Sequence, residues 1–146
     1  MECSICIERA KGAPELFHLG AWVFDVNKAK RIAGRKNREI HKVSAEEVRS
    51  LALMPPPREG CSNLGGFHVD EEHLSHIPDP TEPVIFATFP DAPRSKKDAC
   101  PFVLDGHHRM VRAAHEGRGV SAYLLTANET RRCMLPESRS RLRRLR

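Results

Sequence analysis

The chain has 146 residues, enough for one compact domain with a hydrophobic core and too few for two. Hydrophobic residues make up 40% and charged residues 29%, a balance that argues against a disordered chain and against a membrane protein. The net charge of +5 lies at one end, because residues 131–146 hold seven arginines against Glu137, which leaves −1 for residues 1–130. We therefore expect a single near-neutral domain over 1–130 and an arginine-rich C-terminal tail over 131–146, either disordered or a helix that needs a partner.

The chain carries no sequence signal for a membrane span or for export. It has no run of about 18 apolar residues, and its first residues include acids and cysteines where a signal peptide has basic residues and then an apolar stretch. These features predict a cytoplasmic location. The five cysteines are then expected to be reduced thiols or metal ligands rather than a disulfide framework.

The first half of the chain predicts short elements separated by glycines and prolines. The expected strands cover 16–26, with a bend or bulge at Gly20, then 40–43 and 67–69. The expected helices cover 45–53 and 71–77, the second capped by Asp70, with a turn or short helix over 27–39 and a loop over 58–66. The helix at 45–53 has the clearest start, because Ser44-Ala-Glu-Glu47 has the spacing of a capping box.

The second half predicts a strand, a hairpin, a returning strand, a helix and a last strand. Their expected bounds are 84–89, a hairpin loop at 90–99, a strand at 102–104, a helix at 106–116 ended by Gly117, and a strand at 120–126. This order predicts an α+β fold, with a mixed sheet covered by helices on one side.

A strand-loop-helix junction at residues 102–109, Phe-Val-Leu-Asp-Gly-His-His-Arg, carries the clearest chemical signal. The first N–H groups of a helix have no partner within the helix and carry partial positive charge, so such a junction can hold a phosphate. Gly106 would let the backbone approach closely, and Asp105 would cap the helix or hold a metal ion. We expect Arg109 to face solvent and to present its guanidinium to phosphate oxygens.

The DGHHR sequence at 105–109, followed by Met-Val-Arg-Ala-Ala and the strand Val-Ser-Ala-Tyr-Leu-Leu, resembles the ParB/sulfiredoxin superfamily. Its closest likeness is to the branch of ADP- or ATP-using free-serine kinases. The resemblance covers 83–126 best and does not extend to the first 60 residues. It implies a small ParB/sulfiredoxin-like domain in which Gly106, His107, His108 and Arg109 bind nucleotide phosphates.

The sequence departs from other members of that superfamily. Sulfiredoxins have a catalytic Cys directly before the His-Arg pair, where this chain has His107, so sulfinic-acid reduction is not expected. ParB partition proteins usually have a Glu-Arg-Arg type of loop and a helix-turn-helix domain behind it, and we do not expect such a domain here. The serine kinases supply a catalytic Glu early in the chain, and Glu39, Glu46, Glu47 and Glu71 all stay open for that role.

The first hypothesis is therefore an ATP- or ADP-dependent phosphotransferase or NTPase that uses Mg²⁺. Its catalytic candidates are Asp105 and His108. A plainer interpretation of the same residues makes Asp105 a helix cap, His108 a buried imidazole and Arg109 a solvated side chain.

Two alternatives belong to other functional classes. The tail arginines favour a non-catalytic DNA-binding accessory protein of the same fold, because clustered arginines neutralise phosphates. Cys3 and Cys6 form half of a zinc knuckle, which a Cys/His cluster over 61–76 would complete (Cys61, His68, His73 and His76). We expect no required metal site there, since the ligand spacing is incomplete and His73 and His76 suit a solvated helix face.

Overall fold

The computed structural model describes residues 12, 14–19, 21–35, 37–52, 71–77, 79–90 and 101–144, which form an α+β fold as predicted. The strands are β1 (Leu16–Leu19), β2 (Trp22–Asp25), β3 (His41–Val43), β4 (Val84–Ala87), β5 (Phe102–Asp105) and β6 (Val120–Leu125). The helices are α2 (Val26–Ala33), α3 (Ala45–Ala52), α4 (Glu71–Leu74), α5 (His107–Glu116), α6 (Ala127–Cys133) and α7 (Pro136–Arg144). Of the helices within these ranges, none has the length and apolar character that crossing a membrane requires.

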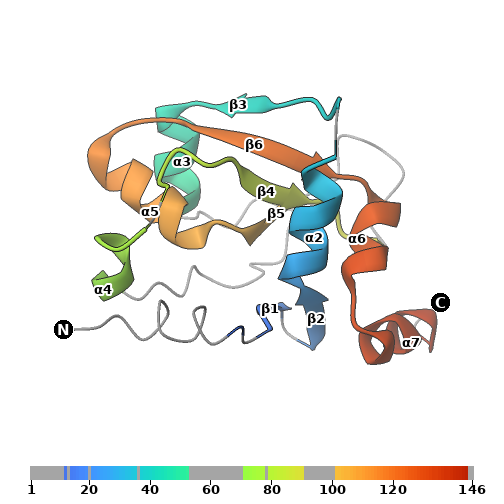
Figure 1. Cartoon of the computed structure of the whole chain (residues 1–146). Coiled ribbons are helices and arrows are strands. Elements are labelled where there is room, and N and C mark those ends of the chain that lie inside the picture. Colours follow the sequence, from blue (N-terminus) through green and yellow to red (C-terminus); the bar gives the residue numbers. More distant parts are fainter. Residues whose placement is uncertain are drawn as a thin grey trace.

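The main sheet has four strands in the order β3-β6-β4-β5 (Figure 1). β4 and β5 pair antiparallel, as the expected hairpin requires, and β3 pairs antiparallel with β6. β4 and β6 are parallel, with Ile85 opposite Tyr123. Because α5 connects β5 to β6 across the sheet, the end of β5 and the start of α5 lie at one end of the sheet, where the predicted phosphate loop falls.

The strands β4 and β5 are buried on both faces of the sheet, which corrects the expectation that helices cover one side. Along β4, Ile85 belongs to a cluster with α2 and α6, whereas Val84 belongs to a second cluster with α3 and α5. The same alternation holds along β5, where Phe102 and Leu104 face the first cluster and Val103 faces the second. Successive side chains of a strand point to opposite faces, so an unbroken apolar run requires cover on both.

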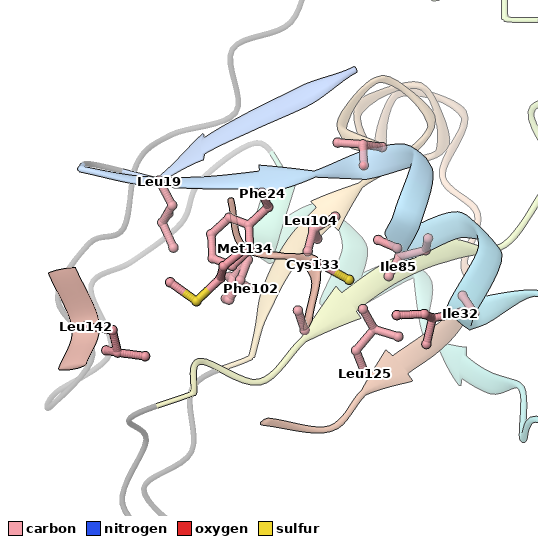
Figure 2. Packing of buried hydrophobic residues seen from close by; sticks show 14 residues of the cluster. Leu19, Phe24, Ile32, Ile85, Phe102, Leu104, Leu125, Cys133, Met134 and Leu142 are labelled. Carbon is pink, nitrogen blue, oxygen red and sulfur yellow. The ribbon is translucent and has the colours of Figure 1, made fainter. Parts of the chain in front are cut away.

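The first cluster is the larger of the two and joins distant parts of the chain (Figure 2). Its fully buried members include Phe24 from β2, Ile32 from α2 and Leu125 from β6. The rings of Phe17 and Phe24 lie 6.1 Å and 5.4 Å from that of Phe102, measured between centroids. These contacts fix the N-terminal strands against the β5 edge of the sheet.

Residues 16–26 form two strands rather than the single bent strand that was expected. β1 and β2 pair antiparallel from Leu16 opposite Asp25 to Leu19 opposite Trp22. Gly20, the expected bend, lies outside the described residues. The sequence does not mark the turn between β1 and β2, because aromatic and aliphatic residues lie on both sides of it and look like one continuous apolar strand.

The arginine-rich end is part of the folded core as far as residue 144, which corrects the expectation of a separate tail. Cys133, Met134 and Leu142 are buried in the first cluster, at 0%, 2% and 3% exposure. The Ser138 hydroxyl accepts a 2.9 Å hydrogen bond from the Val23 backbone N–H. The partner that this helix needs is therefore the β1–β2 hairpin of its own chain.

Side-chain caps define several helix starts. Ser44 Oγ accepts from the Glu47 backbone N–H at the start of α3, as the capping-box spacing predicts. Asp25 accepts from the Lys28 N–H, and so the stretch expected as a turn or short helix is the helix α2. A second capping box, between Thr126 and Glu129, starts α6, a helix that was not predicted.

The remaining expected elements agree in position where the structure describes them. The strands expected at 40–43, 84–89, 102–104 and 120–126 are β3, β4, β5 and β6, and the helix expected at 106–116 is α5. The helix expected at 71–77 is shorter, since α4 covers Glu71–Leu74. The loop at 58–66, the strand at 67–69, Asp70 and nearly all of the loop at 90–99 lie outside the described residues.

Candidate functional site

Gly106 joins β5 to α5 in a conformation that other residues rarely adopt. Its φ is 102° and its ψ is 22°, and it is the N-cap of α5. A Cβ at this position would lie 2.6 Å from Val84 Cγ1 and 3.2 Å from an Arg109 guanidinium nitrogen. Both the backbone angle and the close packing therefore require glycine, which also leaves the first turn of α5 without a side-chain cap.

Asp105 is not the helix cap that was expected. It ends β5, and its Oδ2 accepts a 2.8 Å hydrogen bond from Arg109 Nη2. The carboxylate is 11% exposed, so the ion pair is largely removed from solvent.

Arg109 is buried at 7% exposure, which corrects the expectation that it faces solvent. Its Nη1 donates to the backbone carbonyls of Glu82 and Pro83, both at 2.9 Å, and lies 3.4 Å from the Glu82 carboxylate. Together with the bond to Asp105, these contacts tie the first turn of α5 to the segment before β4. The guanidinium is therefore committed to the protein itself, and Arg109→Ala would not leave the fold unchanged.

The two histidines of the loop lie in different surroundings. His107 Nε2 is 2.8 Å from the Val103 carbonyl oxygen, and its ring centroid lies 5.0 Å from that of Phe17. His108 is half-buried and meets His73 edge to face, with ring centroids 4.8 Å apart. His73 is only 1% exposed, so the solvated helix face expected for His73 and His76 is wrong for the first of these residues.

These residues line one side of a pocket of about 250 Å³ at the start of α5. The pocket wall brings together Asp105, Gly106, His107, His108 and Arg109, the residues that the sequence predicts as a site. The rest of the lining comes from other elements and was not predicted: its charged members are Glu15, Lys30, Asp79 and Glu82. No local motif marks these four residues, because the fold alone brings them to α5.

Several charged side chains of the pocket have partners within the protein. Lys30 Nζ donates to Glu15 Oε1 at 3.1 Å, and both side chains are partly exposed. Hydrogen bonds from the Thr81 side chain and backbone hold the pKa of Asp79 below its usual value of 3.8, with a smaller contribution from Arg109. Four carboxylates (Glu15, Asp79, Glu82 and Asp105) thus outnumber the two permanent cations, Lys30 and Arg109, that line this pocket.

The rival metal site is not assembled in the described part of the chain. No group of three or more His, Cys, Asp or Glu side chains suited to a metal ion occurs among those residues. Cys3, Cys6, Cys61 and His68 lie outside them, so zinc binding at that cluster stays an open hypothesis. Cys100 also lies outside, whereas Cys133 is a buried free thiol.

No family model matches this chain, and it matches neither a curated protein nor a solved structure. The resemblance to the ParB/sulfiredoxin superfamily therefore stays a prediction.

Proposed function

We propose that the pocket at the start of α5 binds the phosphate groups of ADP or ATP, and that the protein is a nucleotide-dependent phosphotransferase or NTPase. The observation that carries this proposal is the Gly106 junction, where a glycine at positive φ begins a ten-residue helix whose first turn has no side-chain cap and lines a pocket. Backbone N–H groups and the helix dipole at such a turn favour a phosphate. Lys30 of α2 adds a cation to the lining of this pocket.

The size of the pocket favours the phosphate end of a nucleotide. Its volume of about 250 Å³ lies just below the range of roughly 300–1,000 Å³ that is usual for whole small-molecule sites. The phosphates would occupy the pocket, and the nucleoside would extend toward the open side. This arrangement agrees with recognition by the helix terminus rather than by a deep base pocket.

The carboxylates on the wall favour a nucleotide that carries Mg²⁺ over a bare phosphate. Mg²⁺ in nucleotide sites is usually held by one or two carboxylates and by the phosphates themselves, so a preformed cage of three protein ligands is not needed. Asp79 and Glu82 are exposed carboxylates on the wall and supply the hard oxygen ligands that Mg²⁺ prefers. The bound ion would offset the negative charge of the phosphates.

The contacts of the loop residues decide which role each side chain can have. Arg109 holds the loop in shape through Asp105 and two carbonyls, and so it acts as a positioning residue. His108 lines the pocket and is the candidate general base for the proton of an attacking hydroxyl or water. Asp105 would take part in catalysis through Oδ1, because its Oδ2 accepts a hydrogen bond from Arg109.

Isothermal titration calorimetry of ADP·Mg²⁺ and ATP·Mg²⁺ tests the proposal. Lys30→Gln and His108→Ala should each weaken binding by about tenfold or more, because a hydrogen bond to a charged group contributes roughly 1.5–3 kcal/mol. Lys42→Gln and His115→Ala are matched controls, since both residues are exposed and lie outside the pocket. Circular dichroism checks folding in all four.

The wild-type protein decides the outcome first. If it binds neither nucleotide at millimolar concentration, with or without Mg²⁺, the phosphate proposal fails. It also fails if folded Lys30→Gln and His108→Ala bind as tightly as the wild type. If the wild type hydrolyses ATP and His108→Ala does not, comparing this loss of activity with the loss of binding would separate catalysis from binding.

A further inference from the structure

A second surface, which we call the basic face, is formed by α2, α6 and α7; of these helices, α2 also lines the nucleotide pocket, through Val26 and Lys30. α2 and α6 pack against each other, and α7 follows α6 closely along the chain (Figure 1). The basic residues on these helices are Lys28, Lys30, Arg31, Arg131, Arg132, Arg139, Arg141, Arg143 and Arg144. Their acidic residues are Glu129 and Glu137.

Cations of this face come from helices that are neighbours in space. α2 and α6 pack against each other. Arg31 of α2 and Arg132 of α6 are both exposed. The positive charge of the face is therefore spread over packed helices and does not belong to α7 alone.

α7 is held in a fixed orientation that leaves Arg143 and Arg144 outward. Ser138 and Leu142, one turn apart, are its buried residues. Arg141 Nη1 donates to the Ala21 carbonyl oxygen at 3.0 Å, which fastens the helix to the β1–β2 hairpin. Arg143 and Arg144 are exposed. The arginines thus belong to a rigid surface, and a partner would not have to order them on binding.

The acids on the basic face do little to neutralise it. Glu129 is already engaged by Arg38 and by the Thr126 backbone N–H. Glu137 lies in the first turn of α7, where a carboxylate interacts favourably with the helix dipole. Lys30 is paired with Glu15, and Arg141 donates to the Ala21 carbonyl, so the cations offered to an anionic partner are the exposed Arg31, Arg132, Arg143 and Arg144.

The composition of the face indicates which anionic partner fits. Among the described residues, the exposed large hydrophobic side chains are Leu16, Ile40 and Leu124, and none belongs to α2, α6 or α7. Helices that insert into membrane surfaces need such apolar residues, and proteins that bind single strands need aromatic platforms. A face of arginines without either matches the phosphate backbone of a duplex.

We propose that the basic face binds the phosphate backbone of duplex nucleic acid without reading its sequence. Binding of this kind gains free energy by releasing counterions, so it weakens steeply as salt rises. The interaction is independent of the nucleotide pocket. Lys30, which belongs to that pocket and is paired with Glu15, is not needed for it.

Fluorescence anisotropy of a labelled 20-base-pair duplex, titrated at several salt concentrations, tests the proposal. The wild type should bind the duplex, and the logarithm of its association constant should fall linearly with the logarithm of the salt concentration, with a slope of about −0.9 per phosphate neutralised. Arg143→Gln/Arg144→Gln should weaken binding by about tenfold at low salt and make that slope shallower by up to about 2. Lys42→Gln/Arg49→Gln removes the same charge from exposed positions on β3 and α3, and it should bind within about threefold of the wild type.

Three outcomes would overturn the proposal, provided that circular dichroism shows both variants folded. One is no binding of the duplex by the wild type at low salt. Another is an equal loss in Lys42→Gln/Arg49→Gln, which would make net charge the cause rather than this face. The third is tighter binding of an unpaired strand, or of vesicles rich in anionic lipid, with the same dependence on Arg143 and Arg144.

Discussion

Replacing Arg109 with methionine should destabilise the protein strongly, although the residue lies in a candidate binding loop. The change removes the guanidinium and keeps the aliphatic stem. It leaves the carbonyls of Glu82 and Pro83 and the Asp105 carboxylate, which is 11% exposed, without their donor. Breaking a buried ion pair by removing one partner costs about 3–5 kcal/mol. That is a third or more of the stability of a typical small domain, so Tm should fall by roughly 10–15 °C.

Urea denaturation followed by circular dichroism measures this effect directly. Arg118→Met is the matched control: this arginine also pairs with a carboxylate, that of Glu116, but the Glu116 side chain is 45% exposed. An exposed ion pair contributes less than about 1 kcal/mol, and the control should change stability by no more than that. If Arg109→Met unfolds within about 0.5 kcal/mol of the wild type, the guanidinium does not support the loop and our assignment of a positioning role is wrong.

Three further variants probe other contacts. Gly106→Ala should lower the free energy of unfolding by at least about 2 kcal/mol, because the added methyl group would lie 2.6 Å from a buried valine. Gly117→Ala should cost less in thermal melts, since its methyl group would have nothing within 4 Å, and equal losses would contradict this. Leu142→Ala should cost about 2–5 kcal/mol of unfolding free energy, and a neutral effect would show that α7 is not anchored. Burial opposes ionisation of Glu129, yet hydrogen bonds from a guanidinium and a backbone N–H hold the pKa of its carboxyl below 4.5. The ionised carboxylate therefore stabilises the folded protein above that pH, and this stabilisation is lost as the pH falls through the lower pKa of the folded state. Denaturation curves should therefore show a steeper loss of stability below pH 4.5 in the wild type than in Glu129→Gln, and parallel curves would refute this.

The sequence predicts the α+β class and most strands of the main sheet because the signals for them are local. Apolar runs of strand length, a helix stop at Gly117 and the capping spacing at Ser44 act within a few residues. The start of α6 carries the same signal as Ser44, since Thr126 and Glu129 have capping-box spacing. This spacing could therefore have predicted α6, but the arginine-rich stretch that follows favoured the prediction of a tail.

Long-range packing explains what the sequence does not predict. Arg109 is typical of a solvated helix residue by its neighbours in sequence, and it is buried because the segment at 82–83 turns its carbonyls toward it. Lys30 enters the candidate site because α2 packs against the sheet. Leu142 is one aliphatic residue in an arginine-rich stretch, and its burial depends on a hairpin near the other end of the chain.

The contact between the β1–β2 hairpin and α7 also bears on how the protein matures during synthesis. Val23 and Ser138 are 115 residues apart, and Met134 forms a bridge with Phe24. The ribosome makes the hairpin more than 100 residues before it makes Met134 and Ser138, which cover it. The nascent protein must therefore carry Phe24 and its neighbours with incomplete cover until residues 134–142 have left the ribosome. In this period the chain is most prone to aggregation and most suited to capture by chaperones.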